Sequence, residues 1–325
     1  MSRNPNNLAL SWALRALTVL LLSWLGVWPA LAGNAWSAVS APLPGPPQVI
    51  GSHAAGCIAG AVALPLVGAG YQVMRPSRNR YYGHPLLVRF VERLGRQAAE
   101  QGVQLLIGDL GQPRGGPMPS GHRSHQSGLD VDVWFLQQPR DRRLTRADTE
   151  RIEMLSMIQP AAGVLQRSRW SPRYRDALRA AALAPEVERI FVNPIIKQTL
   201  CVTESNPDWL EKVRPWWGHD AHFHVRLACP PNDSQCKPQK PFPPGDGCGP
   251  ELAKWVDEIV QAALYPKLRP KPEPPSAQRL PAACDAVLYP ATVGNTPSFP
   301  NAPSTEKNES PLEKNAFSLE RNESP

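Results

Sequence analysis

Two short segments concentrate the side chains that could bind a metal ion. Five of the seven histidines fall in these segments, together with several carboxylates. In the first segment His125 and Asp132 are spaced as His-x6-Asp, and in the second His222 and His224 are spaced as His-x-His. Imidazole nitrogens and carboxylate oxygens are common protein ligands of Zn²⁺. The two segments together therefore predict a metal site.

Both segments also alternate polar and apolar residues, which is typical of β-strands. The polar faces consist of Asp130, Asp132 and Trp134 in residues 129–135, and of His222, His224 and Arg226 in residues 221–227. If the two strands lie side by side, these faces and His125 gather the ligand-type side chains around one point.

The residue types indicate which metal chemistry such a site would support. Two imidazoles and one carboxylate suit Zn²⁺ with a fourth position left to water, and zinc lowers the pKa of that water towards neutrality. Four histidines exceed the needs of one coordination shell, so some of them are expected to act as general base or to steady an oxyanion. The HExxH motif is absent, which excludes a zincin. His53 and His84 are expected to be structural, and Arg226 or Arg123 could meet a substrate carboxylate.

The elements that must position these residues follow from periodicity and from breaker residues. Helices are expected at residues 85–101, 145–158, 173–183 and 251–264, with a short helix running through Lys197 after residue 192. Strands are expected at residues 103–110, 129–135, 187–192 and 221–227. Because the strands follow no regular βαβ order, we predict an α+β single domain. Its central, mainly antiparallel sheet would carry the zinc site and be flanked by helices.

The two ends of the chain have different compositions from the middle. Residues 1–32 are typical of a secretory signal: Arg3 and Arg15 give a positive start, an apolar run follows, and Ala32 ends a small-x-small site. The run of about 12 apolar residues is shorter than the roughly 20 that a spanning helix needs. Proline accounts for 38 residues, 12 of them from residue 266 onward. We therefore expect an extended segment at 33–49, a catalytic domain at 50–288 and a disordered tail at 289–325.

Charge and cysteine usage narrow the class of partner. The formal net charge is +7, which in an exported protein favours anionic envelope polymers or lipid surfaces. No basic stripe interleaved with aromatic residues is present, so nucleic acid is not an expected partner. Six cysteines in an exported chain predict disulfides, for which 15 pairings exist. Cys284 lies inside the proline-rich region, so a bond from it to an upstream cysteine would extend the ordered domain to about residue 288.

At these residues the sequence resembles the penicillin-insensitive murein endopeptidase family, within the lysostaphin, D-Ala-D-Ala peptidase and hedgehog-type zinc group. The similarity covers about residues 50–288. The segments that carry it are Tyr71–Arg75 (YQVMR), Arg80–Pro85 (RYYGHP), Leu106–Asp109 (LIGD), Ser124–Asp132 (SHQSGLDVD), Ile190–Pro194 (IFVNP), Val213–Trp216 (VRPW) and His222–Leu227 (HFHVRL).

The resemblance implies a periplasmic enzyme that hydrolyses D-alanyl–meso-diaminopimelyl cross-links of peptidoglycan. Zinc would be held by residues matching His125, Asp132 and His224, and His122 matches a further position treated as a metal ligand. His222 and His219 match uncoordinated active-site histidines, the candidates for general base or transition-state stabiliser. The implied disulfides are Cys57–Cys284, Cys201–Cys248 and Cys229–Cys236. The family can hold a further metal through an Asp and a His between the two motifs, but here no histidine lies between His125 and His219.

Two other functions stay open at this point. A zinc D,D-carboxypeptidase that trims terminal D-Ala would use the same motifs. A non-catalytic wall-binding protein could keep a structural zinc, although the presence of His219 and His222 argues against it. The expected partners are cross-link peptides of peptidoglycan, with no stable membrane insertion once the signal is removed, and a homodimer stays open.

Overall fold

The computed structural model describes residues 34–119, 123–266 and 279–290. The predicted signal at 1–32, the candidate ligand His122 and residues 291–325 of the predicted tail lie outside these residues. Within them no helix is long and apolar enough to cross a bilayer.

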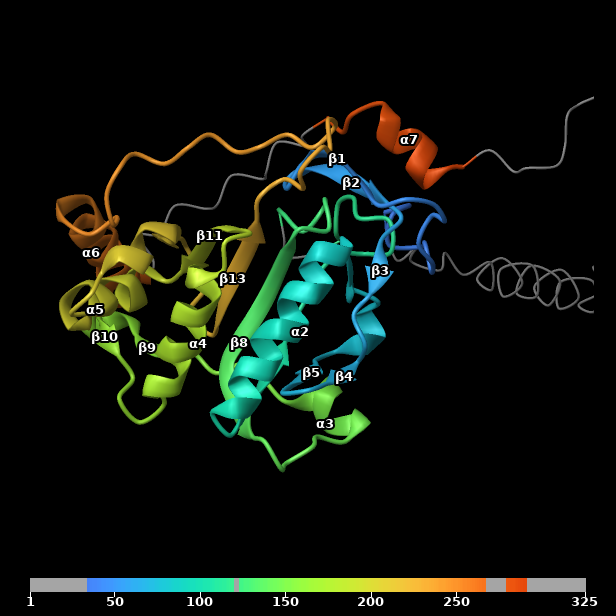
Figure 1. Cartoon of the computed structure of the whole chain (residues 1–325). Helices are drawn as coiled ribbons and strands as arrows, with labels where there is room; N and C mark the ends of the chain where they lie inside the picture. The colour runs from blue at the N-terminus through green and yellow to red at the C-terminus, as the bar shows by residue number, and fades with distance from the viewer. Residues whose placement is uncertain (1–33, 120–122, 267–278, 291–325) are drawn as a thin grey trace, which may run out of the picture. The chain divides into compact units, whose positions relative to one another are not determined.

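A seven-stranded mixed sheet forms the centre of the described part of the molecule (Figure 1). In spatial order its strands are β12 (Val213–Pro215), β11 (Val187–Val192), β13 (His222–Leu227), β8 (Asp130–Pro139), β7 (Val103–Ile107), β5 (Tyr71–Val73) and β4 (Val67–Gly68). The β12–β11 and β7–β5 pairs are parallel, and the other four pairs are antiparallel. The prediction of an α+β domain with a mainly antiparallel sheet is therefore confirmed.

Shorter elements surround the sheet. Three two-stranded sheets pair β1 (Gln48–Ser52) with β2 (Ala55–Ala59), β3 (Val62–Ala63) with β6 (Tyr82–Gly83), and β9 (Ile158–Gln159) with β10 (Val164–Leu165). The α-helices are α2 (Pro85–Glu100), α3 (Arg146–Arg151), α4 (Pro172–Leu183), α5 (Pro194–Thr203), α6 (Pro250–Leu264) and α7 (Ala283–Leu288). Single 3-10 turns are η1 (Pro76–Arg78), η2 (Pro160–Ala162) and η3 (Asp208–Lys212).

Part of the proline excess serves to start helices. Pro85, Pro172, Pro194 and Pro250 each occupy the first position of a helix, where a missing N–H costs nothing. The preceding residue often supplies the cap: Asn193 Oδ1 accepts a hydrogen bond from Ile195 N at 2.9 Å, and His84 Nδ1 accepts one from Leu86 N at 3.1 Å. His84 is thus structural, as predicted.

One face of the sheet carries the main core. The strand residues Val131, Val133 and Phe135 pack there with residues of α2 and α4, which both lie on this face (Figure 1). On the opposite face of β8, Trp134 packs in a separate small cluster with Met74, Leu106 and Leu144. The alternation predicted for residues 129–135 is therefore confirmed, and the polar residues of β8 face away from α2 and α4.

Two predicted helices have different lengths in the structure. The helix expected at 145–158 ends at Arg151, because Ile152 adopts extended ψ (128°) and the chain then enters β9. There Met157 N donates to Asp220 O at 2.8 Å, so a tertiary partner takes the backbone group that a helix would use. The helix expected to run through Lys197 continues instead to Thr203 as α5.

All six cysteines form disulfides, with the pairing that the family resemblance implies: Cys57–Cys284, Cys201–Cys248 and Cys229–Cys236. The first bond attaches α7 to β2, beside the small apolar cluster that contains Trp36, Ile50 and Val287. The end of the described chain is thus held against its beginning.

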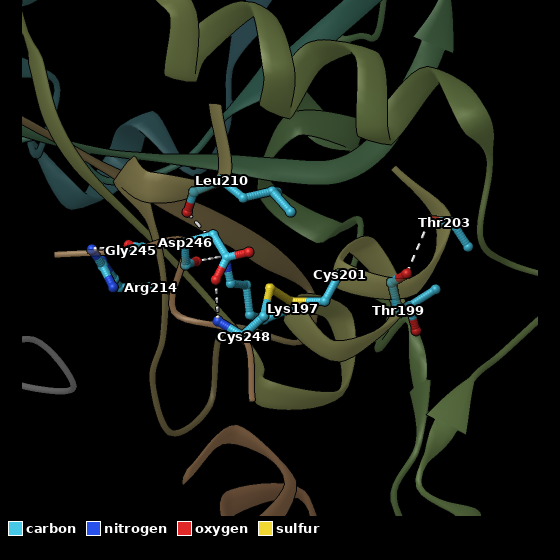
Figure 2. The surroundings of a disulfide bond; sticks show 9 residues. All are labelled: Lys197, Thr199, Cys201, Thr203, Leu210, Arg214, Gly245, Asp246 and Cys248. Atoms are coloured by element: carbon cyan, nitrogen blue, oxygen red, sulfur yellow. Dashed lines mark hydrogen bonds between the residues drawn. A yellow bond between two sulfur atoms is a disulfide. The ribbon is translucent and has the colours of Figure 1, made fainter. Parts of the chain in front are cut away.

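A buried lysine lies beside the Cys201–Cys248 bond (Figure 2). Lys197 on α5 is fully buried, and its Nζ donates hydrogen bonds to Leu210 O at 2.9 Å and to Asp246 O. Burial lowers the pKa of Lys197 from 10.5 to about 7. The amine therefore ties η3 and the loop before α6 to α5.

Candidate metal centre

The pairing of β8 with β13 brings the two histidine-containing segments together. In this antiparallel pair His224 lies opposite Asp132, and Arg226 lies opposite Asp130. Because side chains alternate along both strands, the residues on these opposed positions share one face of the sheet. The gathering of side chains predicted from the spacing is therefore present in the structure.

Three buried side chains offer metal-ligand atoms close to one another. Those of His125, Asp132 and His224 all lie within 4.8 Å of each other. Asp132 Oδ1 is 3.4 Å from His125 Nε2 and 3.2 Å from His224 Nδ1. All three residues are buried, so the donors lie in a medium that strengthens their attraction for a cation. Two imidazole nitrogens and a carboxylate oxygen, with no further protein ligand required, make a donor set that fits catalytic zinc.

His125 is held in place by its backbone. It precedes β8 and has φ of 67°, in the left-handed region that few residues other than glycine adopt. Its N–H donates to Asp130 Oδ2 at 2.9 Å, which anchors the turn to the strand that carries Asp132. A strained backbone of this kind is often found where function requires a particular side-chain position.

Asp130 contacts the residues that surround the candidate ligands. The sequence pattern placed it on the polar face of residues 129–135 but assigned it no role. Its Oδ1 is 3.0 Å from His224 Nε2 and 2.7 Å from Arg226 Nε, and its Oδ2 is 3.3 Å from His53 Nδ1. The contact to Nε2 leaves His224 Nδ1 directed towards Asp132, an arrangement in which a second carboxylate orients a ligand histidine. The Asp-x-Asp spacing opposite His-x-Arg was the available signal for this role.

Arg226 and His53 belong to this supporting group. Arg226 is only 6% exposed and bonds Asp130, so it is not placed to meet a substrate carboxylate as the sequence suggested; Arg123 is exposed. His53, predicted to be structural, is 2% exposed and contacts Asp130.

Burial and ion pairing act in opposite directions on the carboxylates. Burial raises the pKa of Asp132. The charges of His125 and His222 and the hydrogen bonds from the histidines lower it by more than burial raises it, so the pKa lies well below its usual range. The pKa of Asp130 is likewise well below its usual range: burial raises it, and Arg226 and His53 lower it more. Both side chains are therefore carboxylates over the whole physiological range.

His219 and His222 border the ligand cluster on its more open side. His222 Nε2 is 3.6 Å from Asp132 Oδ1, and its side chain is 16% exposed. The ring centroids of His219 and His222 are 5.0 Å apart, and that of His219 is 5.8 Å from the ring of His224. These two histidines, predicted to lie outside the coordination shell, are thus next to the candidate ligands.

The tautomer of His219 follows from its hydrogen bond. His219 Nδ1 is 2.8 Å from Trp217 O, and because a carbonyl oxygen only accepts, Nδ1 carries the proton. Burial lowers the pKa of His219 to about 3, and the neighbouring His224 and His222 lower it in the same direction. The ring is therefore neutral near pH 7, with Nε2 as its basic nitrogen. Like His125, His219 has positive φ, here 53°.

Comparison with known proteins places this geometry in context. A family described as penicillin-insensitive murein endopeptidase matches residues 49–289 of the chain. The chain is also 45% identical over 270 residues to proteins named penicillin-insensitive murein endopeptidase from Salmonella newport, Salmonella typhimurium and Salmonella enteritidis. Each alignment covers 82% of this chain and 98% of the relative.

Proposed function

The chain belongs to the penicillin-insensitive murein endopeptidase family, and from this membership and the metal-centre geometry we propose that it is a zinc-dependent hydrolase of D-alanyl–meso-diaminopimelyl cross-links in peptidoglycan. The observation that carries the proposal is the cluster of His125, Asp132 and His224, whose ligand atoms lie within 4.8 Å of one another beside two further histidines.

The zinc would be bound by His125 Nε2, Asp132 and His224 Nδ1. These atoms are held by independent parts of the fold: a strained turn, β8 and β13. A zinc ion bound to three protein ligands lowers the pKa of a coordinated water and polarises a carbonyl oxygen. His122, whose position lies outside the described residues, stays a further candidate ligand.

We assign His222 and His219 to proton transfer and to stabilisation of the developing oxyanion. One of them takes the proton from the attacking water and returns it to the leaving amine, and the other donates to the carbonyl oxygen of the scissile amide. His219 Nε2 has the free lone pair that a base requires, since Nδ1–H is fixed on Trp217 O. No serine is acylated in this reaction, so β-lactams have no nucleophile to block.

The substrate determines the compartment. Peptidoglycan lies outside the cytoplasm, and three disulfides suit an oxidising compartment such as the periplasm. We therefore propose a periplasmic enzyme exported by the signal predicted at residues 1–32.

The decisive experiment uses purified protein of known metal content and cross-linked muropeptide dimers, with and without a zinc chelator. We expect conversion of dimers to monomers, loss of conversion on chelation, and recovery when Zn²⁺ is added back. Release of free D-Ala with the dimers left intact would instead identify a carboxypeptidase. Metal binding without any product, together with binding to intact peptidoglycan, would identify a non-catalytic wall-binding protein.

Two variants separate ligand from proton-transfer roles. His125→Ala is expected to lose both zinc and activity, whereas His222→Ala keeps the zinc and loses at least about 100-fold in kcat, the usual range for general acid–base groups. Val202→Ala, at a residue that is 82% exposed on α5, serves as the control and should match the parent in both measurements. An unchanged kcat in His222→Ala would show that His222 takes no part in proton transfer or oxyanion stabilisation.

A further inference from the structure

Three tryptophans form an exposed aromatic patch next to the metal centre. Trp216 and Trp217 follow β12 and are 52% and 45% exposed, although tryptophan is among the residues that gain most from burial. Trp255 on α6 is stacked on Trp217, with centroids 5.7 Å apart and an interplanar angle of 15°, and its centroid is 6.4 Å from that of Trp216. We call these three residues the tryptophan platform.

The platform is continuous with the metal centre. Phe191 on β11 lies opposite His224 in the strand register, with ring centroids 5.5 Å apart. Phe191 also contacts Trp216 edge to face, with ring centroids 5.7 Å apart. Trp217 also supplies the carbonyl that fixes the tautomer of His219. A substrate bound over His222 and His219 therefore has the tryptophan platform as its neighbour.

The shape and stiffness of the platform suit one kind of ligand surface. The stack of Trp217 on Trp255 fixes the plane of the indole, so a flat contact costs little conformational entropy. An extended aromatic face that is exposed to water suits a ligand with one apolar face and polar edges. A pyranose ring has this character, because its axial C–H groups form one face and its hydroxyls lie at the rim.

We propose that the tryptophan platform binds a sugar ring of the glycan strand to which the cleaved peptide is attached. The inference rests on the proposed function, since murein supplies both the peptide and the glycan. A stem of about three residues joins a cross-link to its sugar, and three residues of ordinary backbone reach roughly 11 Å when extended. Two ring-to-ring steps, of 5.5 Å and 5.7 Å, separate His224 from Trp216, which is the same scale. The enzyme would thus recognise the glycan and the peptide together.

The test compares two substrates that differ only in their sugars. One is the cross-linked muropeptide dimer with its disaccharides, and the other is the same cross-linked peptide after an amidase has removed them. Trp217→Ala removes the indole but keeps the backbone carbonyl that fixes the tautomer of His219. For this variant we therefore expect KM to rise about tenfold on the glycosylated dimer, the size of one good aromatic contact, and to stay the same on the sugar-free peptide. Trp217→Phe should raise KM on the glycosylated dimer by less than Trp217→Ala does, because it keeps an aromatic face.

Controls separate a binding contact from a disturbed fold or active site. Zinc content and melting temperature should equal those of the parent in Trp217→Ala, and Leu183→Ala, at a 61% exposed residue on α4, should leave both KM values unchanged. An equal rise in KM on both substrates, or no rise on either, would overturn the proposal.

Binding to peptide-free glycan strands, measured by calorimetry, tests the inference without catalysis. The parent should bind and Trp217→Ala should bind at least about tenfold more weakly. If the parent cleaves neither substrate, the proposed function fails while glycan binding still decides the role of the platform. If the parent does not bind glycan and sedimentation shows a dimer that Trp217→Ala dissociates, the platform is an interface between two copies and the proposal is wrong.

Discussion

Asp130 contributes to the candidate metal centre without belonging to the proposed ligand set. It bonds His224, Arg226 and the backbone of His125, so one buried carboxylate helps to position two of the three proposed ligands. Removing its charge would leave the Arg226 guanidinium, only 6% exposed, beside a neutral group.

For Asp130→Asn we therefore expect zinc affinity to fall by about 10- to 100-fold, as for other groups that orient metal ligands. The free energy of unfolding should fall by about 3 kcal/mol, because a buried cation loses its partner. Chelator competition and urea unfolding measure the two effects. Asp208→Asn, at an exposed residue of η3, is the matched control and should change neither quantity. Unchanged zinc affinity in Asp130→Asn would show that the charge of Asp130 is not needed to orient the proposed ligands.

Lys197 makes stability depend on pH in a direction unusual for a lysine. Its pKa is about 7 in the folded protein, because burial lowers it, and near 10.5 when unfolded. Between these values the unfolded chain binds the additional proton, so stability rises with pH. Below about pH 7 the amine is charged in the folded protein as well, and the free energy of unfolding is lower than at high pH by on the order of 5 kcal/mol for a pKa shift of this size.

We expect Lys197→Met to abolish this rise between pH 7 and 9.5, as measured by melting temperature against pH. Leu210 O and Asp246 O lose their hydrogen-bond donor in the variant, which changes its absolute stability. The quantity to compare is therefore the slope of melting temperature against pH. Lys254→Met, at an exposed position of α6, should keep the parental slope. A parental slope in Lys197→Met would show that other groups cause the pH dependence.

At the scale of elements, the contact between α2 and the start of β5 depends on a glycine within the helix. A Cβ at Gly95 would lie 2.6 Å from Ala69 O and 2.7 Å from Tyr71 Cδ1. Helix propensity alone favours alanine over glycine by about 1 kcal/mol.

We nevertheless expect Gly95→Ala to lower the free energy of unfolding by about 1–3 kcal/mol, because a backbone oxygen cannot move aside as a side chain can. Urea unfolding measures the change. Arg96→Ala, at the neighbouring exposed position, should stay within about 0.5 kcal/mol of the parent. A stabilised Gly95→Ala would mean that α2 shifts away from β5 at little cost.

Among the elements, the two central strands were predictable from the sequence and the end of one helix was not. Period-two alternation at 129–135 and 221–227 is enough to predict strands β8 and β13 and the face that holds Asp132 and His224, because one face packs apolar residues into the core while the other carries mostly polar residues. The helix predicted at 145–158 is wrong beyond Arg151: Ile152 leaves the helical conformation, and Met157 N binds a distant carbonyl, that of Asp220. Local patterns carry no information about such a partner.

Part of the candidate site was likewise predictable from the sequence, and part was not. Residue type and spacing identify the donors, and the resemblance assigns their roles. The support of His224 by Asp130 depends on strand register and was not predicted, since a shift of one residue would place Asp130 elsewhere. The tryptophan platform joins two residues that follow β12 to one residue of α6, far apart in the chain, so no local signal indicates it.

At the scale of the whole molecule, the disulfides close loops of very different length. Cys57 and Cys284 are 227 residues apart, whereas Cys229 and Cys236 are 7 apart. Cross-links stabilise mainly by restricting the unfolded chain, and the restriction grows with the logarithm of loop length.

We expect the double variant Cys57→Ser/Cys284→Ser to lose about 5 kcal/mol and Cys229→Ser/Cys236→Ser about 2.5 kcal/mol, on the chain-entropy estimate. Urea unfolding of both variants without reductant gives the comparison, and the order of the two losses is the prediction. Equal losses would indicate that strain or residual structure in the unfolded chain dominates over loop length.

The three bonds are also nested: the first cysteine pairs with the last, the second with the fifth, and the third with the fourth. A chain that enters an oxidising compartment from its N-terminus exposes Cys57 and Cys201 long before their partners arrive. Oxidation in order of appearance would join these two to each other, and exchange through a thiolate must then undo the bond. Under the proposed export, maturation would therefore require the exchange of such early bonds, and not only the formation of new ones.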